Sequence, residues 1–241
     1  MTKSRIIIIL IINFGINLFS EEVKLPDGSI VKCNIQNGLF SGNGMQFWSN
    51  ENYYKGEFNS GVYNGIDELK TDNYLYKGNF KDGKINGNGE ITFTTGITYH
   101  GNFLNGVYEG KGTLTNSNGD VYIGEFKNGM KNGNGTLTLS SGNSYTGNFT
   151  NDYYEGKGVF VFSNDDKYLG TFKNGDFEGE GTYIYANGKK VKGLFHDGML
   201  VSKNKISKSG IFSLILFLSL LGNIILSFMV KKVRKPCQSK K

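Results

Sequence analysis

The sequence predicts an all-β protein, a single elongated, twisted antiparallel sheet of stacked β-hairpins, followed by a C-terminal transmembrane helix. Three observations lead to this fold class. A phrase rich in glycine and aromatic residues returns at a fixed interval, its apolar residues alternate with a period of two, and 20 residues without a charge lie near the C-terminus. Alternation with a period of two is typical of strands, and about 20 apolar residues span the hydrocarbon core of a bilayer.

The repeated phrase begins eight times. The interval between starts is 23 residues, except for one interval of 22. The unit reads Y-x-G-x-F-x-N-G-x-x-x-G-x-G-x-φ-x-φ-x-x-G-x-x, where φ is apolar or aromatic. A fixed period of this length is the signature of a repeat architecture. The starts are Val31, Tyr54, Tyr76, Tyr99, Tyr122, Tyr145, Tyr168 and, for a final half-repeat, Val191.

Each half of the unit predicts one strand. Tyr99, Gly101 and Phe103 alternate with polar residues in a first half, as Ile91 and Phe93 do in a second half. Asn-Gly or a close variant separates the two halves, and a similar turn separates neighbouring units. Because both residues of Asn-Gly accept positive φ, this dipeptide is the strongest short hairpin signal. We therefore expect one hairpin per unit and a meander of about 15 strands.

Glycines at the third, twelfth and fourteenth positions share strand parity with the aromatic residues. We expect all of them to face the aromatic side of the sheet and to leave room for a ring to lie across the backbone. The opposite face carries Thr, Lys, Glu and Asn and is expected to face solvent. The structural glycines expected at the third position are Gly78, Gly101, Gly124, Gly147 and Gly170.

This phrase resembles the MORN (membrane occupation and recognition nexus) repeat. The resemblance covers Val31 to about Met199 and is most specific in the units that begin at Tyr76, Tyr99, Tyr122 and Tyr168. It implies a stack of hairpins in one elongated sheet, with a scaffolding, dimerising or membrane-associating role rather than a catalytic one. The first unit departs from the pattern with Val31 and Cys33, and Asp67 replaces the fourteenth-position glycine of the second unit.

Two aromatic rows, at the first and fifth positions of the unit, form the candidate binding face. Two interpretations are open: the rows are the core of the hairpin stack, or part of them stays exposed as a groove for a peptide, a glycan or a second copy of the chain. The candidate residues are Tyr76, Phe80, Tyr99, Phe103, Tyr122, Phe126, Tyr145, Phe149, Tyr168 and Phe172.

The two ends of the chain predict export and anchoring. Residues 1–20 combine a positive start with a short apolar stretch, as a signal peptide does, and cleavage after Ser20 is expected. The repeat array then covers residues 21–200, a polar linker 201–210, and the transmembrane helix 211–230. The basic tail 231–241 is expected in the cytoplasm by the positive-inside rule. The repeat domain of this single-pass membrane protein is then extracytoplasmic, in the periplasm or at the cell exterior.

The net charge and the residue types of the array exclude several classes of function. The span from Glu21 to Asp197 holds 21 acidic residues against 16 lysines, a net charge of −5, and has no arginine, so we expect no nucleic-acid partner. The sequence has two histidines and two cysteines without metal-ligand spacing, and it has no nucleophile–base constellation. We therefore expect no enzyme, no catalytic or metal site and no cofactor.

The sequence favours a membrane-anchored, exported scaffold that binds a protein partner or itself. One weak contact repeated in every unit would give such a scaffold avidity. Two alternatives stay open: a module that binds glycan or cell wall, for which aromatic rows are suited, and a repeat domain that associates with lipid. The net negative charge of the array opposes attraction to anionic headgroups.

Overall fold

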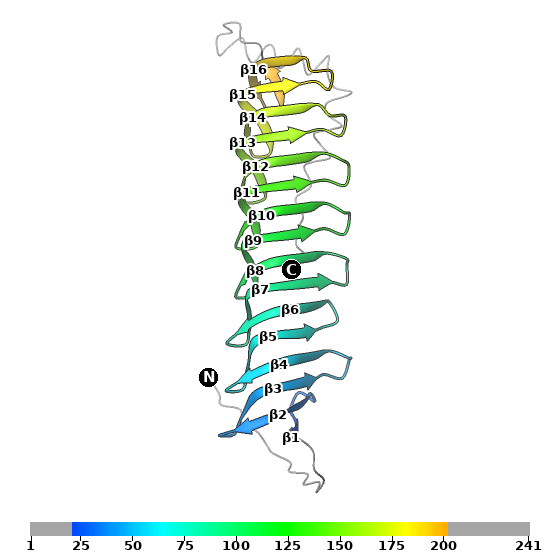
Figure 1. Ribbon diagram of the computed structural model, residues 1–241, viewed down its shortest axis with the longest axis vertical. Helices are drawn as coiled ribbons and strands as arrows, with labels where there is room; N and C mark the ends of the chain where they lie inside the picture. The colour runs from blue at the N-terminus through cyan, green and yellow to red at the C-terminus, as the bar shows by residue number, and fades with distance from the viewer. Residues whose placement is uncertain (1–20, 202–241) are drawn as a thin grey trace. The chain divides into compact units, whose positions relative to one another are not determined.

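The computed structural model describes residues 21–201. The predicted signal peptide, transmembrane helix and tail lie outside these residues, as does the linker apart from Val201. The regular elements of residues 21–201 are β-strands, assigned to one 17-stranded antiparallel sheet (Figure 1), which confirms the all-β prediction. Within this described part, no helix is long and apolar enough to cross a bilayer.

The described residues divide into two compact units, 21–129 and 130–201. Unit 1 holds ten strands: β1 (Glu21–Lys24), β2 (Ile30–Gln36), β3 (Leu39–Phe47), β4 (Tyr53–Asn59), β5 (Val62–Lys70), β6 (Tyr74–Lys81), β7 (Lys84–Phe93), β8 (Thr98–Leu104), β9 (Val107–Thr115) and β10 (Val121–Lys127). Unit 2 holds seven: β11 (Met130–Thr138), β12 (Ser144–Thr150), β13 (Tyr153–Val161), β14 (Lys167–Lys173), β15 (Asp176–Ile184), β16 (Lys190–His196) and β17 (Met199–Val201).

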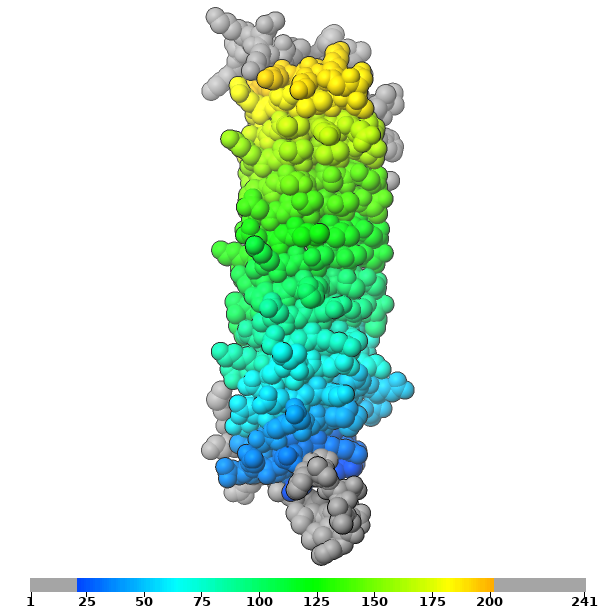
Figure 2. All heavy atoms as spheres, viewed as in Figure 1, coloured from blue at the N-terminus to red at the C-terminus, as the bar shows by residue number. Residues whose placement is uncertain are grey.

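Within each unit, every strand pairs antiparallel with the next strand in the sequence. In Figure 2 the colours change gradually along each compact unit, in the order of the sequence, because consecutive strands lie side by side. The turns have the expected geometry: Asn105 and Gly106, for example, have φ values of 51° and 84°. At the two ends of the described residues, β1 pairs with β2 ahead of the first repeat start, and β17 completes a hairpin with β16 in the final half-repeat.

Six of the described hairpins contain a β-bulge. In the hairpin of β12 and β13, pairing passes from Gly147–Gly158 directly to Asn148–Glu155. Equivalent register shifts occur in the hairpins β2–β3, β4–β5, β6–β7, β8–β9 and β14–β15. The twelfth-position glycine lies in each bulge with positive φ, 68° for Gly156. A bulge bends the strand and increases its twist, so each of these hairpins is bent near its middle.

Neighbouring hairpins are joined at their turns by an additional backbone hydrogen bond. The eighth-position N–H donates to the tenth-position carbonyl of the preceding hairpin, as from Gly106 to Ile85 at 2.8 Å and from Gly175 to Tyr154 at 3.0 Å. The same bond recurs at the other turns within repeats, from residues 61, 83, 129, 152 and 198. Each turn therefore has a fixed position against the hairpin before it.

Candidate interaction surface

The tyrosine at the first position of the unit lies across glycine backbone. A Cβ atom at Gly112 would lie 2.5 Å from Tyr99 Oη and 2.6 Å from its ring carbons. A Cβ atom at Gly101 would lie 2.6 Å from the same hydroxyl oxygen. These distances are shorter than carbon atoms tolerate. At Gly112 the ring occupies the space of a side chain, and at Gly101 the ring and the Cα atom of the paired Gly112, also at 2.6 Å, occupy it together. Gly78, Gly147 and Gly170 have the same surroundings, since a Cβ atom there would lie 2.3–2.5 Å from the hydroxyl oxygen of the tyrosine two places before.

The expectation for the twelfth position was wrong. A Cβ atom at Gly87 would lie 3.1 Å from Asn79 Cβ, and one at Gly156 would meet no atom within 4 Å. No ring lies against these glycines. They are needed instead for the positive φ of the bulge, 101° at Gly87 and 68° at Gly156. A parity rule cannot reveal this, because the bulge interrupts the alternation of faces.

The tyrosine hydroxyl has a fixed acceptor in each unit. Tyr99 Oη donates to the carbonyl oxygen of Asn102 at 2.9 Å, and Tyr145 Oη donates to that of Asn148 at 2.9 Å. The tyrosines at 54, 76, 122 and 168 make the same bond to the residue three places on. Burial raises the pKa of Tyr145 to about 12, so the hydroxyl stays a donor at physiological pH. Tyrosine at the first position therefore makes a hydrogen bond that phenylalanine could not make.

A third aromatic row, at the tenth position, was missed by the sequence analysis. Tyr108 stacks on Tyr99 with ring centroids 3.8 Å apart, and Phe177 stacks on Tyr168 at 3.9 Å. Tyr63 and Tyr154 stack in the same way on the tyrosines of their units. The signal was present in the sequence, since the tenth positions read Phe40, Tyr63, Ile85, Tyr108, Lys131, Tyr154, Phe177 and Leu200.

The candidate binding face is buried. None of its ten residues, Tyr76, Phe80, Tyr99, Phe103, Tyr122, Phe126, Tyr145, Phe149, Tyr168 and Phe172, is more than 4 % exposed. Within the units their rings pack edge to face, with Tyr76 and Phe103 centroids 5.4 Å apart. Of the two interpretations, the structure therefore favours the core of the hairpin stack over an open groove. The bend at the bulge and the row of stacked tenth-position rings cover this face.

Two departures from the repeat pattern have compensations in the structure. In the first unit, Val31 leaves the space of a ring empty, and the Cys33 side chain lies there, with Sγ 3.3 Å from the Ser41 carbonyl oxygen. In the second unit, Tyr54 Oη donates to the buried Asp67 carboxylate at 2.5 Å. Burial raises the pKa of Asp67 above 3.8, although the hydrogen bonds from Tyr54 and from the Glu57 N–H partly oppose this shift.

Exposed apolar side chains lie at the turn edge of the hairpins. In compact unit 1, the ninth position of a repeat is occupied by Leu39, Val62 and Val107, and the sixth position by Leu104. These four side chains are 41–50 % exposed. A Cβ atom at Gly83 of the next turn would lie 3.7 Å from Val62 Cβ, so the row borders the turns. In unit 2, Met130 and Tyr153 occupy the same ninth position and are also exposed. We call these side chains the turn-edge row.

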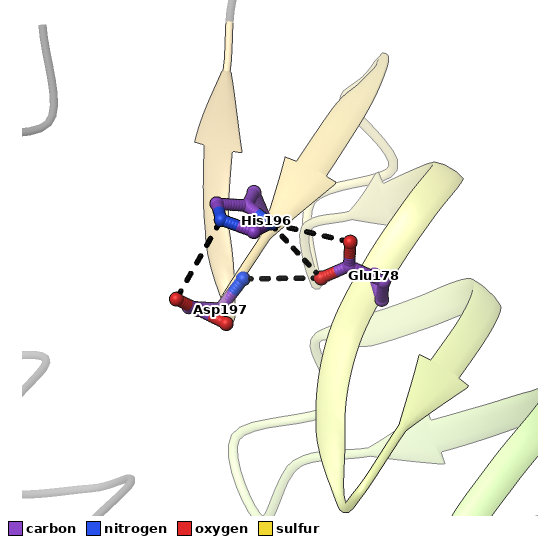
Figure 3. A group of neighbouring side chains, drawn as sticks. All are labelled: Glu178, His196 and Asp197. Carbon is purple, nitrogen blue, oxygen red and sulfur yellow. Dashed lines mark hydrogen bonds and ion pairs between the residues drawn. The ribbon is translucent and has the colours of Figure 1, made fainter. Parts of the chain in front are cut away.

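A group of two carboxylates and a histidine lies at the last hairpin (Figure 3). His196 Nδ1 is 3.2 Å from both carboxylate oxygens of Glu178, and its Nε2 is 3.7 Å from Asp197 Oδ2. The donor types and their spacing match a metal site in outline. However, Glu178 also accepts the Asp197 N–H at 3.4 Å.

This last contact is a structural feature of the repeat. Glutamate at the eleventh position accepts the N–H of the seventh-position residue in the next turn, from Asn128 to Glu109 at 3.0 Å and from Asn174 to Glu155 at 3.1 Å. Glu178 occupies the same place and makes the same bond to its next turn. Its position is therefore explained by the hairpin stack alone, and all three side chains of Figure 3 are at least partly open to solvent.

Shallow pockets open on the polar face in both units. The larger, of about 520 Å³, lies in unit 1 over β5, β6, β7 and β8, and five of its lining residues are asparagines: Asn64, Asn79, Asn86, Asn88 and Asn102. The pocket of unit 2, of about 380 Å³, is lined instead by charged and small residues, with Lys157 and Glu180 among them. Sequence analysis expected this face to be solvated and did not single out either pocket.

The repeats match a known family model, and the chain was also compared with curated proteins and solved structures. A family model described as the MORN repeat matches residues 76–98, 99–121, 122–144, 145–167 and 168–190. Among curated proteins, no sequence matches the chain. A similar solved structure is the TCP domain of SAS-4 (dCPAP) of Drosophila melanogaster in complex with a proline-rich motif of Ana2 (dSTIL). It is 12 % identical, with 78 % of this chain and 99 % of that chain covered, at a TM-score of 0.36. The five consecutive matches show that residues 76–190 of this chain are MORN repeats.

Proposed function

We propose that this MORN repeat chain is a scaffold without catalytic activity, which binds proteins through the turn-edge row. MORN repeats suggest a scaffold for protein or membrane interaction. The observation that supports protein binding most directly is the exposure of Leu39, Val62, Leu104 and Val107 along one edge of unit 1, each 41–50 % exposed. Single exposed apolar residues are ordinary, but a row that returns at one position of the repeat, interrupted by Lys84 between Val62 and Val107, offers a partner several contacts.

The size of each contact fits a multivalent interaction. Full burial of a Val or Leu side chain contributes about 1.5–3 kcal/mol, and these side chains are already half buried, so each contributes about 1 kcal/mol on binding. A single contact of this size is too weak to hold a partner. Several along the edge give useful affinity, with a second copy of the chain or a different protein as the partner.

The buried aromatic core argues against glycan binding, and the net charge of the array argues against lipid binding. Sugar rings stack on exposed aromatic faces, whereas the first- and fifth-position rings are covered. Lipid association through the array is opposed by 21 acidic residues against 16 lysines, a net charge of −5 over Glu21 to Asp197. The proposal therefore names protein as the ligand of the array.

Export and anchoring are part of the proposal and are supported by the sequence alone. Residues 1–20 read as a signal peptide, and residues 211–230 are long and apolar enough for one transmembrane helix before a basic tail. With this topology, the array lies outside the cytoplasm. Protease added to intact cells should then digest the array while the tail 231–241 stays protected, and a protected array would contradict the topology.

Charge placed in the turn-edge row tests the binding proposal. Leu104 and Val107 flank the turn of the β8–β9 hairpin, so we substitute Leu104→Asp and Val107→Asp together in the full-length chain. We expect capture of a protein partner, or self-association in light scattering, to fall at least about tenfold. Thr92→Asp, on an exposed strand residue of β7, is the matched control and should leave binding unchanged. Equal loss in both variants, or no loss in either, would contradict the proposal.

A further inference from the structure

The first and last strands of the described residues are two different parts of one repeat. In a complete repeat the second strand pairs with the first in two blocks, at positions 9–11 and 14–17, as in the β12–β13 hairpin. β17 supplies only the first block, because Met199–Val201 pairs with Leu194–His196. β1 supplies only the second block: its register on β2, with Val23 opposite Val31, is that of positions 14–17 against the next repeat, as β11 has against β12.

Each end therefore leaves a strand edge open. Residues Lys190–Gly193 of β16 pair with β15 on one side, and β17 is too short to cover their other side. The repeat pattern ends after Val201, since Ser202 stands at the twelfth position, where all seven complete repeats have a glycine with positive φ. At the other end of residues 21–201, β1 pairs with β2 alone. Open strand edges pair readily with a further strand.

The two open edges fit each other in register. If β1 of one copy lies beside β16 of another copy with the pairing of a complete repeat, Val23 is opposite Val191, an apolar pair at positions 16 and 1. The next pair along the strands is Glu22 and Lys192, which have opposite charges. Glu22 already makes an ion pair of 3.1 Å with Lys32 of β2, so it would lie between two lysines. Cross-strand pairs of these kinds stabilise a sheet.

The two remaining pairs of this register are tolerable. Lys190 would face Lys24, but both side chains are exposed, so solvent and salt screen their repulsion. Gly193 would face Glu21, which stands at the fourteenth position, where most repeats have glycine beneath a tyrosine ring. No such ring occupies this space in the final half-repeat, because Val191 stands at its first position.

Apolar side chains at the two ends are exposed where equivalent side chains inside the array are covered. An aromatic tenth-position side chain packs against the fifth-position ring of the next repeat, as Tyr108 does against Phe126 with ring centroids 5.8 Å apart. The fifth-position phenylalanines are at most 4 % exposed. By contrast, Leu200, the last tenth-position residue, is 41 % exposed, and Ile35, the first fifth-position residue, is only partly buried. In the register above, Leu200 of one copy covers Ile35 of the next.

The turns at the two ends have a matching donor and acceptor. Inside the array, the eighth-position N–H donates to the tenth-position carbonyl of the preceding hairpin. Among residues 21–201, Gly38 is the first eighth-position residue and follows no complete hairpin, while Leu200 is the last tenth-position residue and precedes none. The same register brings the Gly38 N–H to the Leu200 carbonyl oxygen of the other copy.

We propose that the chain associates head to tail with a second copy of itself, with β1 of one copy paired to Lys190–Gly193 of the next, so that two copies complete one repeat between them. Such an interface is heterologous, so each assembly keeps one open edge at either end and grows beyond a dimer. The inference goes beyond the proposed function, because it assigns self-association to the ends of the array and leaves the turn-edge row to a different protein.

A charge at each end tests the interface. Leu200→Asp acts at the C-terminal edge, and Leu194→Asp is its matched control. Leu194 lies in the same hairpin and is 39 % exposed, but its fourth-position side chain belongs to the polar face. Ile35→Asp acts at the N-terminal edge. Glu22→Lys, on an exposed side chain, tests the same edge without altering apolar packing.

Sedimentation velocity of the full-length chain in detergent micelles measures the association. We expect the wild type to form species larger than dimers as its concentration rises. The Kd of association should rise at least about tenfold in Leu200→Asp and in Ile35→Asp and about threefold or more in Glu22→Lys. It should stay unchanged in Leu194→Asp and in the turn-edge variant with Leu104→Asp and Val107→Asp. Circular dichroism and the unfolding midpoint confirm that the variants fold.

A mixture of Leu200→Asp and Ile35→Asp tests whether the contact is head to tail. Each variant alone keeps one intact edge and should be monomeric, whereas the mixture should form a one-to-one dimer and stop there. If Ile35→Asp fails to fold, Glu22→Lys takes its place. A monomeric wild type, growth that stops at a dimer, equal loss in Leu194→Asp and Leu200→Asp, or a mixture that stays monomeric would each overturn the inference.

The outcomes for the two surfaces are separable. Self-association that the turn-edge variant abolishes and Leu200→Asp leaves intact would remove this inference and support the turn-edge row. Self-association lost in Leu200→Asp, together with capture of a different protein that the turn-edge variant does not weaken, would support this inference and remove the proposed role of the turn-edge row.

Discussion

Replacement of Gly112 by alanine tests the packing of the Tyr99 ring on the hairpin backbone. Gly112 has no positive φ, so alanine introduces no backbone strain there. The new methyl group would lie 2.5 Å from Tyr99 Oη and 2.6 Å from two ring carbons. Since the nearest atoms all belong to one side chain, the ring must move, and its stack on Tyr108 at 3.8 Å and its hydrogen bond to Asn102 at 2.9 Å are disturbed.

The cost follows from these two contacts. Extra volume in a packed core costs about 1–3 kcal/mol, and a hydrogen bond lost from a buried hydroxyl adds about 1 kcal/mol. We therefore expect Gly112→Ala to lower the free energy of unfolding by about 2–4 kcal/mol, a large share of the stability of a typical domain. Urea denaturation followed by circular dichroism measures the change, and hydrogen exchange of β8 and β9 shows whether it is local to this hairpin.

A double-mutant cycle separates the clash from other effects of alanine. Tyr99→Val is the natural partner, because Val31 occupies the first position of the first unit. Once the ring is absent, Gly112→Ala should cost about 0.5 kcal/mol, which gives a coupling energy of about 1.5–3.5 kcal/mol. If alanine is harmless beside Tyr99, or equally harmful beside valine, the glycine does not serve to seat the ring and the explanation of the repeat pattern fails.

Three further predictions address single groups. Tyr145→Phe keeps the ring but removes the donor to the Asn148 carbonyl, so chemical denaturation should show a loss of about 1 kcal/mol. Burial raises the pKa of Asp67 in the folded state above its ordinary value of 3.8, so this carboxyl group favours folding most when it is protonated. The free energy of unfolding of Asp67→Asn relative to wild type should therefore increase as pH rises through and above 4. A difference that stays constant with pH would refute this. Burial also raises the pKa of the Cys33 thiol, so peptide-level mass spectrometry should find it alkylated in urea but protected at pH 8 in the folded protein, and equal labelling would contradict its burial.

Much of the fold could be predicted from the sequence because the pattern is local. The alternation of Tyr99, Gly101 and Phe103 places three side-chain positions on one face, and the Asn-Gly turns define the hairpins. Glycine at the third and fourteenth positions could be connected with the tyrosine ring for the same reason. In the structure, Gly101 and Gly112 are paired across the β8–β9 hairpin below this ring.

The features that sequence reasoning missed depend on geometry between strands. The bulge breaks the parity on which the expectation for Gly87 and Gly110 rested. The burial of the aromatic rows depends on how far each hairpin bends, which a period of two does not encode. Tyr108 was left unassigned because the tenth position varies among aromatic, aliphatic and lysine side chains. The pocket over β5 to β8 is lined by residues from more than one repeat, so no single repeat contains it.

The central claim is that the first-position tyrosines form the core and that recognition uses the exposed surfaces around them. Nitration of the folded chain by tetranitromethane, mapped by mass spectrometry, tests it directly, since the reagent modifies exposed tyrosines. Tyr153 and Tyr185, which are 49 % and 41 % exposed, should react first, and Tyr99 and Tyr145, which are fully buried, should react only on unfolding. Nitration of Tyr99 and Tyr145 as fast as that of Tyr153 would show an open aromatic face and contradict the account.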